Sequence, residues 1–448
     1  MTQTAPATWL RNPLAIAADA PGGVVVRDGR IVELVAAGKT PSAPATAFDA
    51  SRHAVLPGLV NTHHHFYQTL TRCLPAALDR TLFGWLQALY PIWARLTPEA
   101  LDAAVTVAMA ELLLSGCTTT TDHHYVFPPG LEDAIPIEAA AASRLGIRAV
   151  LTRGSMDLSQ RGGGLPPDTV VQDMDAILAD SERLIARLHD PAPHAMLQIA
   201  LAPCSPFSVT TRLMQETAAL ADRRGVRLHT HLAETADEAA FCQARFGCTP
   251  LDYLDRCGWI RPGTWLAHGI HFSDPEIARL GRAGVGVTHC ACSNQVLASG
   301  TCRVCALEAA GVAVGLGVDG SASNDGSNMM QEVRAAFLVQ RAANGVEAVS
   351  HRDALRWATQ GSADVLGRPE LGRIAVGAAA DLALFTLDEL RFSGAGDPLA
   401  ALVLCGAHRA DRVMVGGRWV VEDGRIPGLD LPALVARHGA AARWLLAE

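Results

Sequence analysis

Short apolar runs alternate with stretches of helical spacing through the middle of the chain. Each run is followed by polar or glycine-rich residues and then by apolar positions that recur every three or four residues. The eight runs are Val55–Asn61, Cys117–Asp122, Arg148–Arg153, Leu197–Ala202, Arg227–His231, Thr264–His268, Gly286–Cys290 and Val312–Val318. Eightfold alternation of strand and helix over this length predicts a parallel (β/α)8 barrel of the TIM type.

Both ends of the chain carry β-strand patterns instead. Val24–Val32 holds two β-branched runs around an Asp-Gly pair, a strong hairpin signal, and Arg412–Val421 repeats the design around Gly-Gly. Ala380–Phe385 adds a further strand. We therefore expect the two ends to build one small β-sandwich domain. The expected boundaries are 1–58 for its first part, 59–370 for the barrel, and 371–448 for its second part with a terminal helix.

Composition and charge exclude several classes of protein. Hydrophobic residues make up 49% of the 448, which fits an α/β enzyme better than a disordered or fibrous chain. With a net charge of −8 and no basic run, a nucleic-acid polymer is not expected as a partner. There is no apolar stretch of membrane length and no signal-peptide pattern, and the eleven cysteines are scattered. These features predict a cytoplasmic chain with reduced thiols.

Histidines stand where the predicted barrel strands end, which is the face on which barrel chemistry collects. Residues at i and i+2 share a face of a strand, so His63 and His65 point together and His64 points away. The same spacing places His229 and His231 on one face. Because His231 lies nearer the open end of its strand, it is the better metal ligand.

Three further residues complete this pattern. Glu234 follows His231 by three residues and suits acid/base chemistry, His268 ends the sixth strand, and Asp319 ends the eighth between two glycines. Three histidines and one aspartate leave a position open for water, as a catalytic zinc site requires. Each piece alone has a simpler explanation, such as a turn or a core histidine. Their ordered occurrence at strand ends favours a metal centre.

The same residues resemble a known family. Pro57–His65 resembles the amidohydrolase signature Pro-Gly-x-x-Asp-x-His-x-His, with Asn61 where aspartate is commoner. His231–Glu234 and Gly317–Gly320 resemble later motifs of its aminohydrolase/chlorohydrolase branch. Gly372–Leu382 resembles the return into that family's small β-domain. The similarity extends over essentially the whole chain.

Within that branch the chain is similar to the 8-oxoguanine deaminases, on the runs His65–Arg72, Asp122–Pro128 and Asp319–Gly326. The resemblance implies a hydrolytic deaminase that converts 8-oxoguanine, a small purine-like substrate, to urate and ammonia. Isocytosine, guanine, pterins and s-triazines stay open as substrates, the last with an amine or chloride as the leaving group. A non-catalytic barrel scaffold is the remote alternative.

The resemblance also implies a metal and a set of roles. The implied cofactor is one divalent ion, Zn²⁺ with Fe²⁺ as an alternative, and the implied ligands are His63, His65, His231 and Asp319. Lys39 is the only lysine, which independently disfavours a lysine-bridged metal pair in the barrel. The implied catalytic residues are Asp319, which takes a proton from water, Glu234, which protonates the ring nitrogen, and His268, which steadies the developing oxygen.

Residues that contact the substrate are harder to choose. Gln68 follows the His-x-His by three residues, so its amide could bind a ring edge. His123 and Arg153 stand at the ends of the second and third strands, and an arginine suits an oxo-rich ring. Each of the three could equally be structural. The family resemblance further implies a homo-oligomer.

Overall fold

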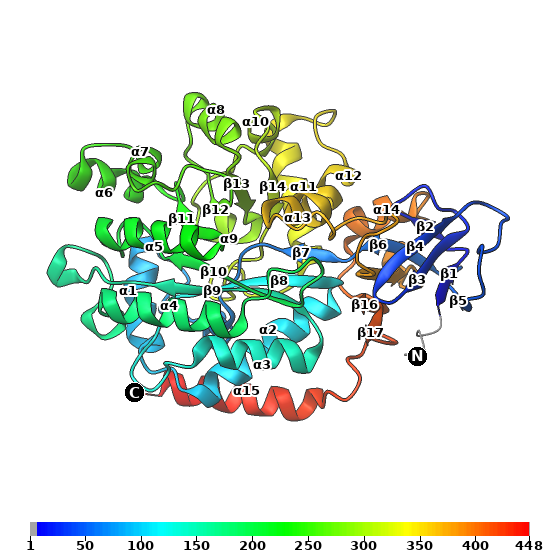
Figure 1. Cartoon of the computed structure of the whole chain (residues 1–448), viewed down its shortest axis with the longest axis horizontal. Coiled ribbons are helices and arrows are strands. Elements are labelled where there is room, and N and C mark those ends of the chain that lie inside the picture. The colour runs from blue at the N-terminus through cyan, green and yellow to red at the C-terminus, as the bar shows by residue number, and fades with distance from the viewer. Residues whose placement is uncertain (1–6, 448) are drawn as a thin grey trace.

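A closed ring of parallel strands forms the centre of the computed structural model, which describes residues 7–447 (Figure 1). The strand order is that of the sequence, and every neighbouring pair is parallel. The strands are β7 (Leu59–Asn61), β8 (Cys117–His124), β9 (Arg148–Ser155), β10 (Leu197–Pro203), β11 (Leu228–Leu232), β12 (Thr264–His268), β13 (Gly286–His289) and β14 (Val314–Leu316). The predicted (β/α)8 barrel is confirmed.

The last strand closes the barrel against the first. Thr62 N donates to Leu316 O at 3.0 Å, and Asp319 N donates to His63 O at 3.1 Å. The side chain of Asn61 reinforces this seam because its amide is both acceptor and donor. Its Oδ1 accepts a hydrogen bond from Val318 N at 2.9 Å, and its Nδ2 donates to Thr120 Oγ1 on β8 at 3.1 Å. Because the barrel closes between β14 and β7, the residues that follow these two strands lie close together.

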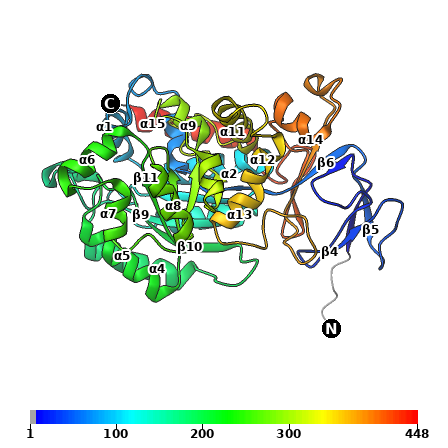
Figure 2. The ribbon, with the colours of Figure 1, turned by 90° about the horizontal axis from the view of Figure 1, so that it is seen from above.

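Helices cover the outside of the barrel (Figures 1 and 2). They are α1 (Leu82–Trp93), α2 (Pro98–Leu114), α3 (Ala134–Leu145), α4 (Met174–Leu188), α5 (Thr211–Arg224), α6 (Ala236–Phe246), α7 (Pro250–Arg256), α8 (Asp274–Ala283), α9 (Ala291–Val296), α10 (Val304–Ala309), α11 (Met329–Asn344), α12 (His351–Arg356) and α13 (Ser362–Val365). Local chemistry sets their ends. For example, Thr97 caps α2 by accepting from Ala100 N, and Gly225 ends α5 in the left-handed region that glycine favours. Within residues 7–447, none of the helices combines the length and apolar character that a membrane span needs.

The predicted first strand is two strands. β6 (His53–Pro57) pairs in a separate sheet, and β7 begins only after Gly58. A Cβ at Gly58 would lie 2.1 Å from Thr118 Oγ1, so the crossing between the two sheets needs glycine. The apolar run Val55–Asn61 does not show this break, because both strands are buried.

Both ends of the chain form a small β-region at one end of the barrel (Figure 2). One sheet has the order β4-β3-β1-β5 and the other β17-β16-β15-β6-β2. Their remaining strands are β1 (Thr8–Arg11), β2 (Ala15–Ile16), β3 (Gly23–Arg27), β4 (Arg30–Val35), β5 (Thr46–Asp49), β15 (Leu382–Thr386), β16 (Arg412–Val415) and β17 (Arg418–Val421). The two sheets share an apolar core, and both predicted hairpins turn through pairs of left-handed residues at the expected positions. A small β-domain beside the barrel, built from both ends, is confirmed.

A buried ion pair joins this β-region to the barrel. Both nitrogens of the Arg148 fork on β9 bind the Asp381 carboxylate, at 3.0 and 3.1 Å. The two residues are 1% and 2% exposed. Arg148 also donates to the carbonyls of His194 and Ala195, and Asp381 accepts from Gly416 N. Such a pair is stabilising only when both charges are fully hydrogen-bonded, as they are at this junction.

The terminal helix α15 (Leu431–Leu446) returns to the barrel and lies along α2 (Figure 1). Arg437 Nη1 on α15 donates to Asp102 Oδ2 at 2.6 Å, and His438 Nε2 lies 3.1 Å from Thr69 Oγ1. The expected third segment, 371–448, therefore ends in a helix that packs on the barrel, not on the small sheets. The remaining helix between β15 and β16 is α14 (Pro398–Ala401).

Candidate metal centre

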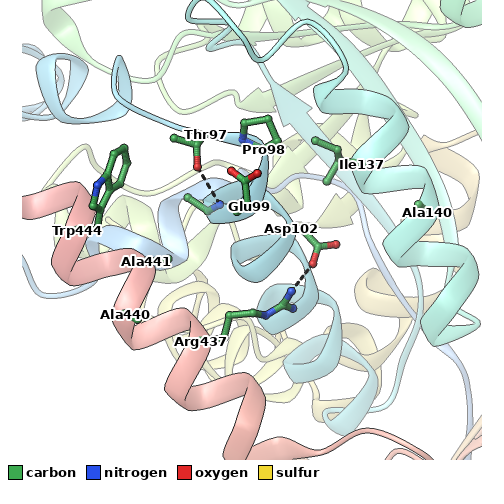
Figure 3. A pocket seen from close by; sticks show the side chains of 11 residues that line it. Thr97, Pro98, Glu99, Asp102, Ile137, Ala140, Arg437, Ala440, Ala441 and Trp444 are labelled. Carbon is green, nitrogen blue, oxygen red and sulfur yellow. Dashed lines mark hydrogen bonds and ion pairs between the residues drawn. The ribbon is translucent and has the colours of Figure 1, made fainter.

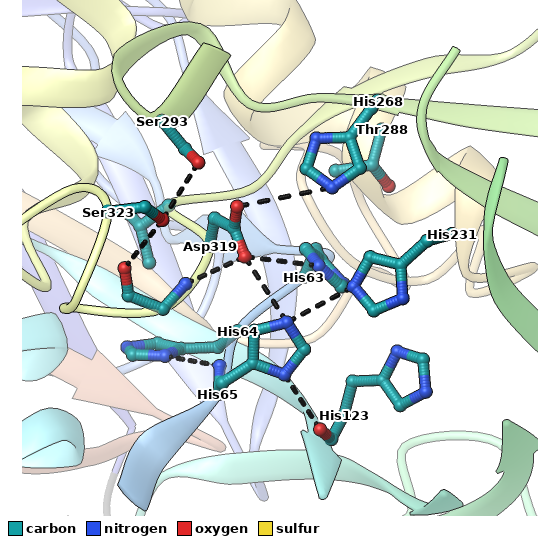
Figure 4. Close-up of polar contacts among 12 residues, drawn as sticks. His63, His64, His65, His123, His231, His268, Thr288, Ser293, Asp319 and Ser323 are labelled. Carbon is teal, nitrogen blue, oxygen red and sulfur yellow. Dashed lines mark hydrogen bonds and ion pairs between the residues drawn. The ribbon is translucent and has the colours of Figure 1, made fainter. Parts of the chain in front are cut away.

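Four donor side chains converge at the open end of the barrel (Figure 4). Asp319 Oδ1 lies 3.3 Å from the Nε2 atoms of both His63 and His65. The Nε2 atoms of His65 and His231 lie 3.2 Å apart. Ligands at about 2.1 Å from a tetrahedral ion are separated by ~3.4 Å, so these spacings suit a shared ion. His64 points away and contacts Ser327 Oγ at 3.0 Å instead.

The hydrogen bonds of the histidine Nδ1 atoms show which ring nitrogens face the centre of this group. His65 Nδ1 donates to His123 O, and His231 Nδ1 donates to Cys204 O, each at 2.7 Å. Both rings thus present a bare Nε2 to the centre, the arrangement of metal-ligating histidines. His63 Nε2 is buried and has no hydrogen-bond partner. Three bare imidazole nitrogens and a carboxylate fit a divalent metal ion.

Burial and pairing put these groups in the protonation states that ligands need. Burial lowers the pKa of His63 to about 4 and the pKa of His231 well below its ordinary value. Burial acts in the opposite direction on Asp319, but the contacts of its carboxyl with the His63 and His65 rings hold its pKa well below its usual range. Neutral rings around an ionised carboxylate result.

The backbone is held in the left-handed region at three positions of the site. The φ angles are +55° at Ala233, +72° at His268 and +63° at Asp319. Residues with a Cβ rarely adopt this region, and such strain collects at functional sites. At Asp319 it is supported by hydrogen bonds from its N–H to His63 O and from Gly320 N to Oδ1. These turns aim the side chains into the barrel mouth.

Glu234 and His268 lie next to each other beside the predicted metal ligands. His268 Nε2 lies 3.5 Å from Glu234 Oε2 and 4.0 Å from Asp319 Oδ2. The other ring nitrogen of His268 donates to Asn294 Oδ1 at 3.0 Å. Glu234 is 4% exposed, and burial together with the charge of Asp319 raises the pKa of its carboxyl. A carboxyl that keeps its proton near neutral pH suits proton transfer.

Glu238, at the start of α6, was missed in the sequence. Its carboxylate accepts from Ala233 N at 2.9 Å and from Glu234 N at 3.2 Å. It therefore holds the strained turn that presents Glu234. Its spacing of four residues from Glu234 was a signal, but acidic residues are common in a first helical turn.

The converging groups line a small cavity of about 30 Å³. Its lining residues are His65, Gln68, Leu82, Trp85, Leu86, Tyr125, Cys204, Phe207, His231, Glu234, His268, Leu297, Asp319 and Ser323. Ligand pockets usually measure ~300–1,000 Å³, so a ligand enters only if covering side chains move. Leu82, Trp85 and Leu86 of α1 form that cover, and Trp85 Nε1 donates to Ala322 O at 3.1 Å.

Of the three predicted substrate contacts, only Gln68 lines this cavity. Its amide lies against Gly320, where a Cβ would come within 1.9 Å of Gln68 Oε1. His123 lies below the metal ligands, where its ring stacks on His231 at 4.6 Å. Arg153 faces the helices and pairs with Asp180 at 2.9 Å. These placements do not support substrate contact by His123 or Arg153, because β9 turns Arg153 outward and His231 covers His123.

Tyr125 and Cys204 line the cavity and were not chosen from the sequence. Each follows the end of a barrel strand, β8 and β10 respectively. The strand-end rule that identified the ligands could have found both.

A second buried group of donors lies on the helix side of β8. His124 Nδ1 and Glu138 Oε1 are 2.9 Å apart, and Asp122 completes the group. Burial raises the pKa values of both carboxyls well above their usual range. Asp122 Oδ1 also accepts from Phe66 N at 2.6 Å, directly after His65. Through this hydrogen bond, Asp122 supports the turn that follows His65.

A larger hollow of about 810 Å³ lies on the outer side of the barrel between α2, α3 and α15 (Figure 3). Its walls carry the Asp102–Arg437 ion pair and the half-exposed Trp444. None of the residues that line it is a histidine or a cysteine. Histidines that could bind a metal therefore line the smaller cavity and not this hollow.

Comparison with known proteins agrees with this geometry. The model of the amidohydrolase family matches residues 54–420. The 8-oxoguanine deaminase of Pseudomonas aeruginosa is 62% identical over 445 residues, which cover 98% of this chain and 99% of that protein. Hydroxydechloroatrazine ethylaminohydrolase of Pseudomonas sp. is 39% identical, covering 91% and 88%. The solved structure of atrazine chlorohydrolase from Arthrobacter aurescens TC1, complexed with zinc, superposes with a TM-score of 0.91 at 32% identity, covering 97% and 100%.

Proposed function

The chain belongs to the amidohydrolase family, and from this membership we propose that it deaminates 8-oxoguanine hydrolytically, with urate and ammonia as products. The resemblance to this family found in the sequence is confirmed. One observation carries the choice of substrate, namely 62% identity along nearly the whole chain to an 8-oxoguanine deaminase. Three further relatives, 36–39% identical, act by their names on isoxanthopterin, a hydroxylated atrazine derivative, or 5-methylthioadenosine and S-adenosylhomocysteine.

A divalent metal belongs to this site, and we propose that it is a single zinc ion. The residues that would hold it are His63, His65, His231 and Asp319. When bound, such an ion makes water a competent nucleophile at neutral pH and polarises the reacting centre. Zinc is supported by this donor set and by its presence in the related chlorohydrolase structure.

The chain's own acid/base groups would move the protons. Asp319 Oδ1 is engaged by His63 and His65, which leaves Oδ2 free to accept a proton from the attacking water. Glu234 would deliver a proton to the ring nitrogen beside C2, then take the proton of the hydroxyl formed at C2 and pass it to the departing amine. The proton held by Asp319 would afterwards return Glu234 to its acid form. His268 faces both carboxylates through Nε2, so it is placed to donate to the developing oxygen.

The cavity walls would orient the ring and exclude water. Leu82, Trp85 and Phe207 supply apolar surface, and the Gln68 amide offers both a donor and an acceptor to a ring edge. Because the cavity of about 30 Å³ is much smaller than a usual ligand pocket, we expect the α1 side chains that line it to shift when the substrate enters. The homo-oligomeric state and the cytoplasmic location stay predictions.

A substrate panel tests this proposal. Zinc-loaded protein is incubated with 8-oxoguanine, isocytosine, guanine, cytosine, a pterin and hydroxy-triazines, while ammonia is measured enzymatically and urate by its absorbance. We expect 8-oxoguanine to give the highest kcat/KM, with urate and ammonia in equal amounts. A higher kcat/KM for another compound would show that 8-oxoguanine is not the preferred substrate. Turnover of none of the compounds would overturn the proposed reaction.

A further inference from the structure

His229 lies below the metal centre and was passed over as a ligand. It is fully buried on β11, two residues before His231. Its Nδ1 lies 3.0 Å from Trp265 O, and its Nε2 lies 2.8 Å from His63 Nδ1. Its ring stacks on the Trp265 indole, with centroids 4.4 Å apart and planes 11° apart. The three groups form one continuous chain of hydrogen bonds that leads to a metal ligand.

The direction of this chain follows from what each atom can do. A carbonyl oxygen only accepts, so His229 Nδ1 carries a hydrogen. No carboxylate contacts either nitrogen of His229, and an uncompensated charge at this depth would be costly, so the ring is neutral. Its Nε2 is then an acceptor, and His63 Nδ1 must be the donor. His63 Nε2 is left bare, and this is the buried nitrogen that has no hydrogen-bond partner.

The other two histidine ligands need no such intermediary. His65 and His231 donate directly to backbone carbonyls, those of His123 and Cys204. His63 Nδ1 instead contacts His229 Nε2, and His229 in turn donates to the carbonyl of Trp265. A residue in this place must donate at one end and accept at the other, which a neutral imidazole does.

We propose that His229 is a positioning residue that fixes the Nδ1–H tautomer of His63 and so keeps His63 Nε2 available to the metal. The inference rests on the proposed metal centre, but not on the identity of the substrate. Partners that orient a metal-bound histidine typically change metal affinity about 10–100-fold when they are removed.

The test compares two substitutions at this position. His229→Phe keeps an aromatic ring over Trp265 but cannot accept a hydrogen bond, whereas His229→Gln offers an amide oxygen to His63. Zinc affinity is measured by competition with a chromophoric chelator, and the unfolding temperature of the metal-free protein is measured in parallel. The matched control is His289→Phe, which removes another fully buried barrel histidine outside this chain of hydrogen bonds.

We expect His229→Phe to weaken zinc binding about 10–100-fold, with His229→Gln closer to the wild type and His289→Phe unchanged. Wild-type affinity in His229→Phe would overturn the inference, as would an equal loss in His289→Phe. If His229→Phe does not fold, ¹⁵N-histidine spectra of the wild type decide the question. His63 and His229 must both be Nδ1–H tautomers, and an Nε2–H form of His229 would refute the relay. None of these readouts uses turnover, so a failure of the proposed substrate remains distinguishable.

Discussion

Replacement of Glu234 by glutamine removes one proton carrier and little else. The carboxyl is 4% exposed and 3.5 Å from His268 Nε2, and its backbone N–H is fixed by Glu238. The amide of Glu234→Gln occupies the same volume but cannot transfer a proton to the ring nitrogen. General acid/base catalysis contributes about 10²–10⁴-fold, which corresponds to ~3–5 kcal/mol of transition-state stabilisation. The loss should fall on kcat, since Glu234 is outside the proposed ligand set.

The assay measures steady-state ammonia release and bound zinc on the same preparation. Glu238→Gln is the matched control, because it disturbs the support of the Ala233–Glu234 turn while leaving the acid itself. We expect the control to lose about tenfold, less than the direct substitution. A Glu234→Gln enzyme within threefold of the wild type would refute the assigned role. So would a loss of zinc that accounts for the lost activity.

Three other predictions concern the ligands, the junction and the terminal helix. His64→Asn should keep zinc and His65→Asn should lose it, since only His65 faces the centre; metal loss from the first variant, seen by atomic absorption, would contradict the geometry. Asp381→Ala should lower the free energy of unfolding by about 3–5 kcal/mol, because Arg148 is left charged and buried; a change under 1 kcal/mol in urea titrations would contradict this. Burial lowers the pKa of His438 from 6.5 to about 4, so as the pH falls through this range the unfolded chain takes up a proton before the folded protein does. The free energy of unfolding therefore decreases as the pH falls from about 6.5 to about 4. After allowance for partial exposure, the stability difference between wild type and His438→Gln should change by about 1 kcal/mol over this range, and a constant difference would exclude the effect.

The barrel and the convergence of the four proposed ligand side chains could be predicted because both obey short-range rules. Strands buried on both faces appear as apolar runs, and these runs located all eight barrel strands to within a few residues. Alternation along a strand separated His64 from His63 and His65 without any knowledge of the fold. The shared strand-end edge of a barrel then grouped His231 and Asp319 with them.

The remaining features depend on contacts between distant segments. The break at Gly58 is imposed by Thr118, which belongs to a neighbouring strand. Arg153 is long enough to reach either side of the barrel wall, and Asp180 on α4 holds it outside. His229 shares a strand face with His231, but its proposed role depends on the position of Trp265 O, which belongs to another strand. Sequence spacing carries no information about such partners.

Turnover of 8-oxoguanine during titration of metal-free protein with zinc tests the central claim most directly. We expect no urate without metal, a rise in rate proportional to bound zinc, and saturation at one ion per chain. Urate formation by the metal-free protein would contradict the proposed centre. Absence of urate from the fully loaded protein would contradict the proposed reaction.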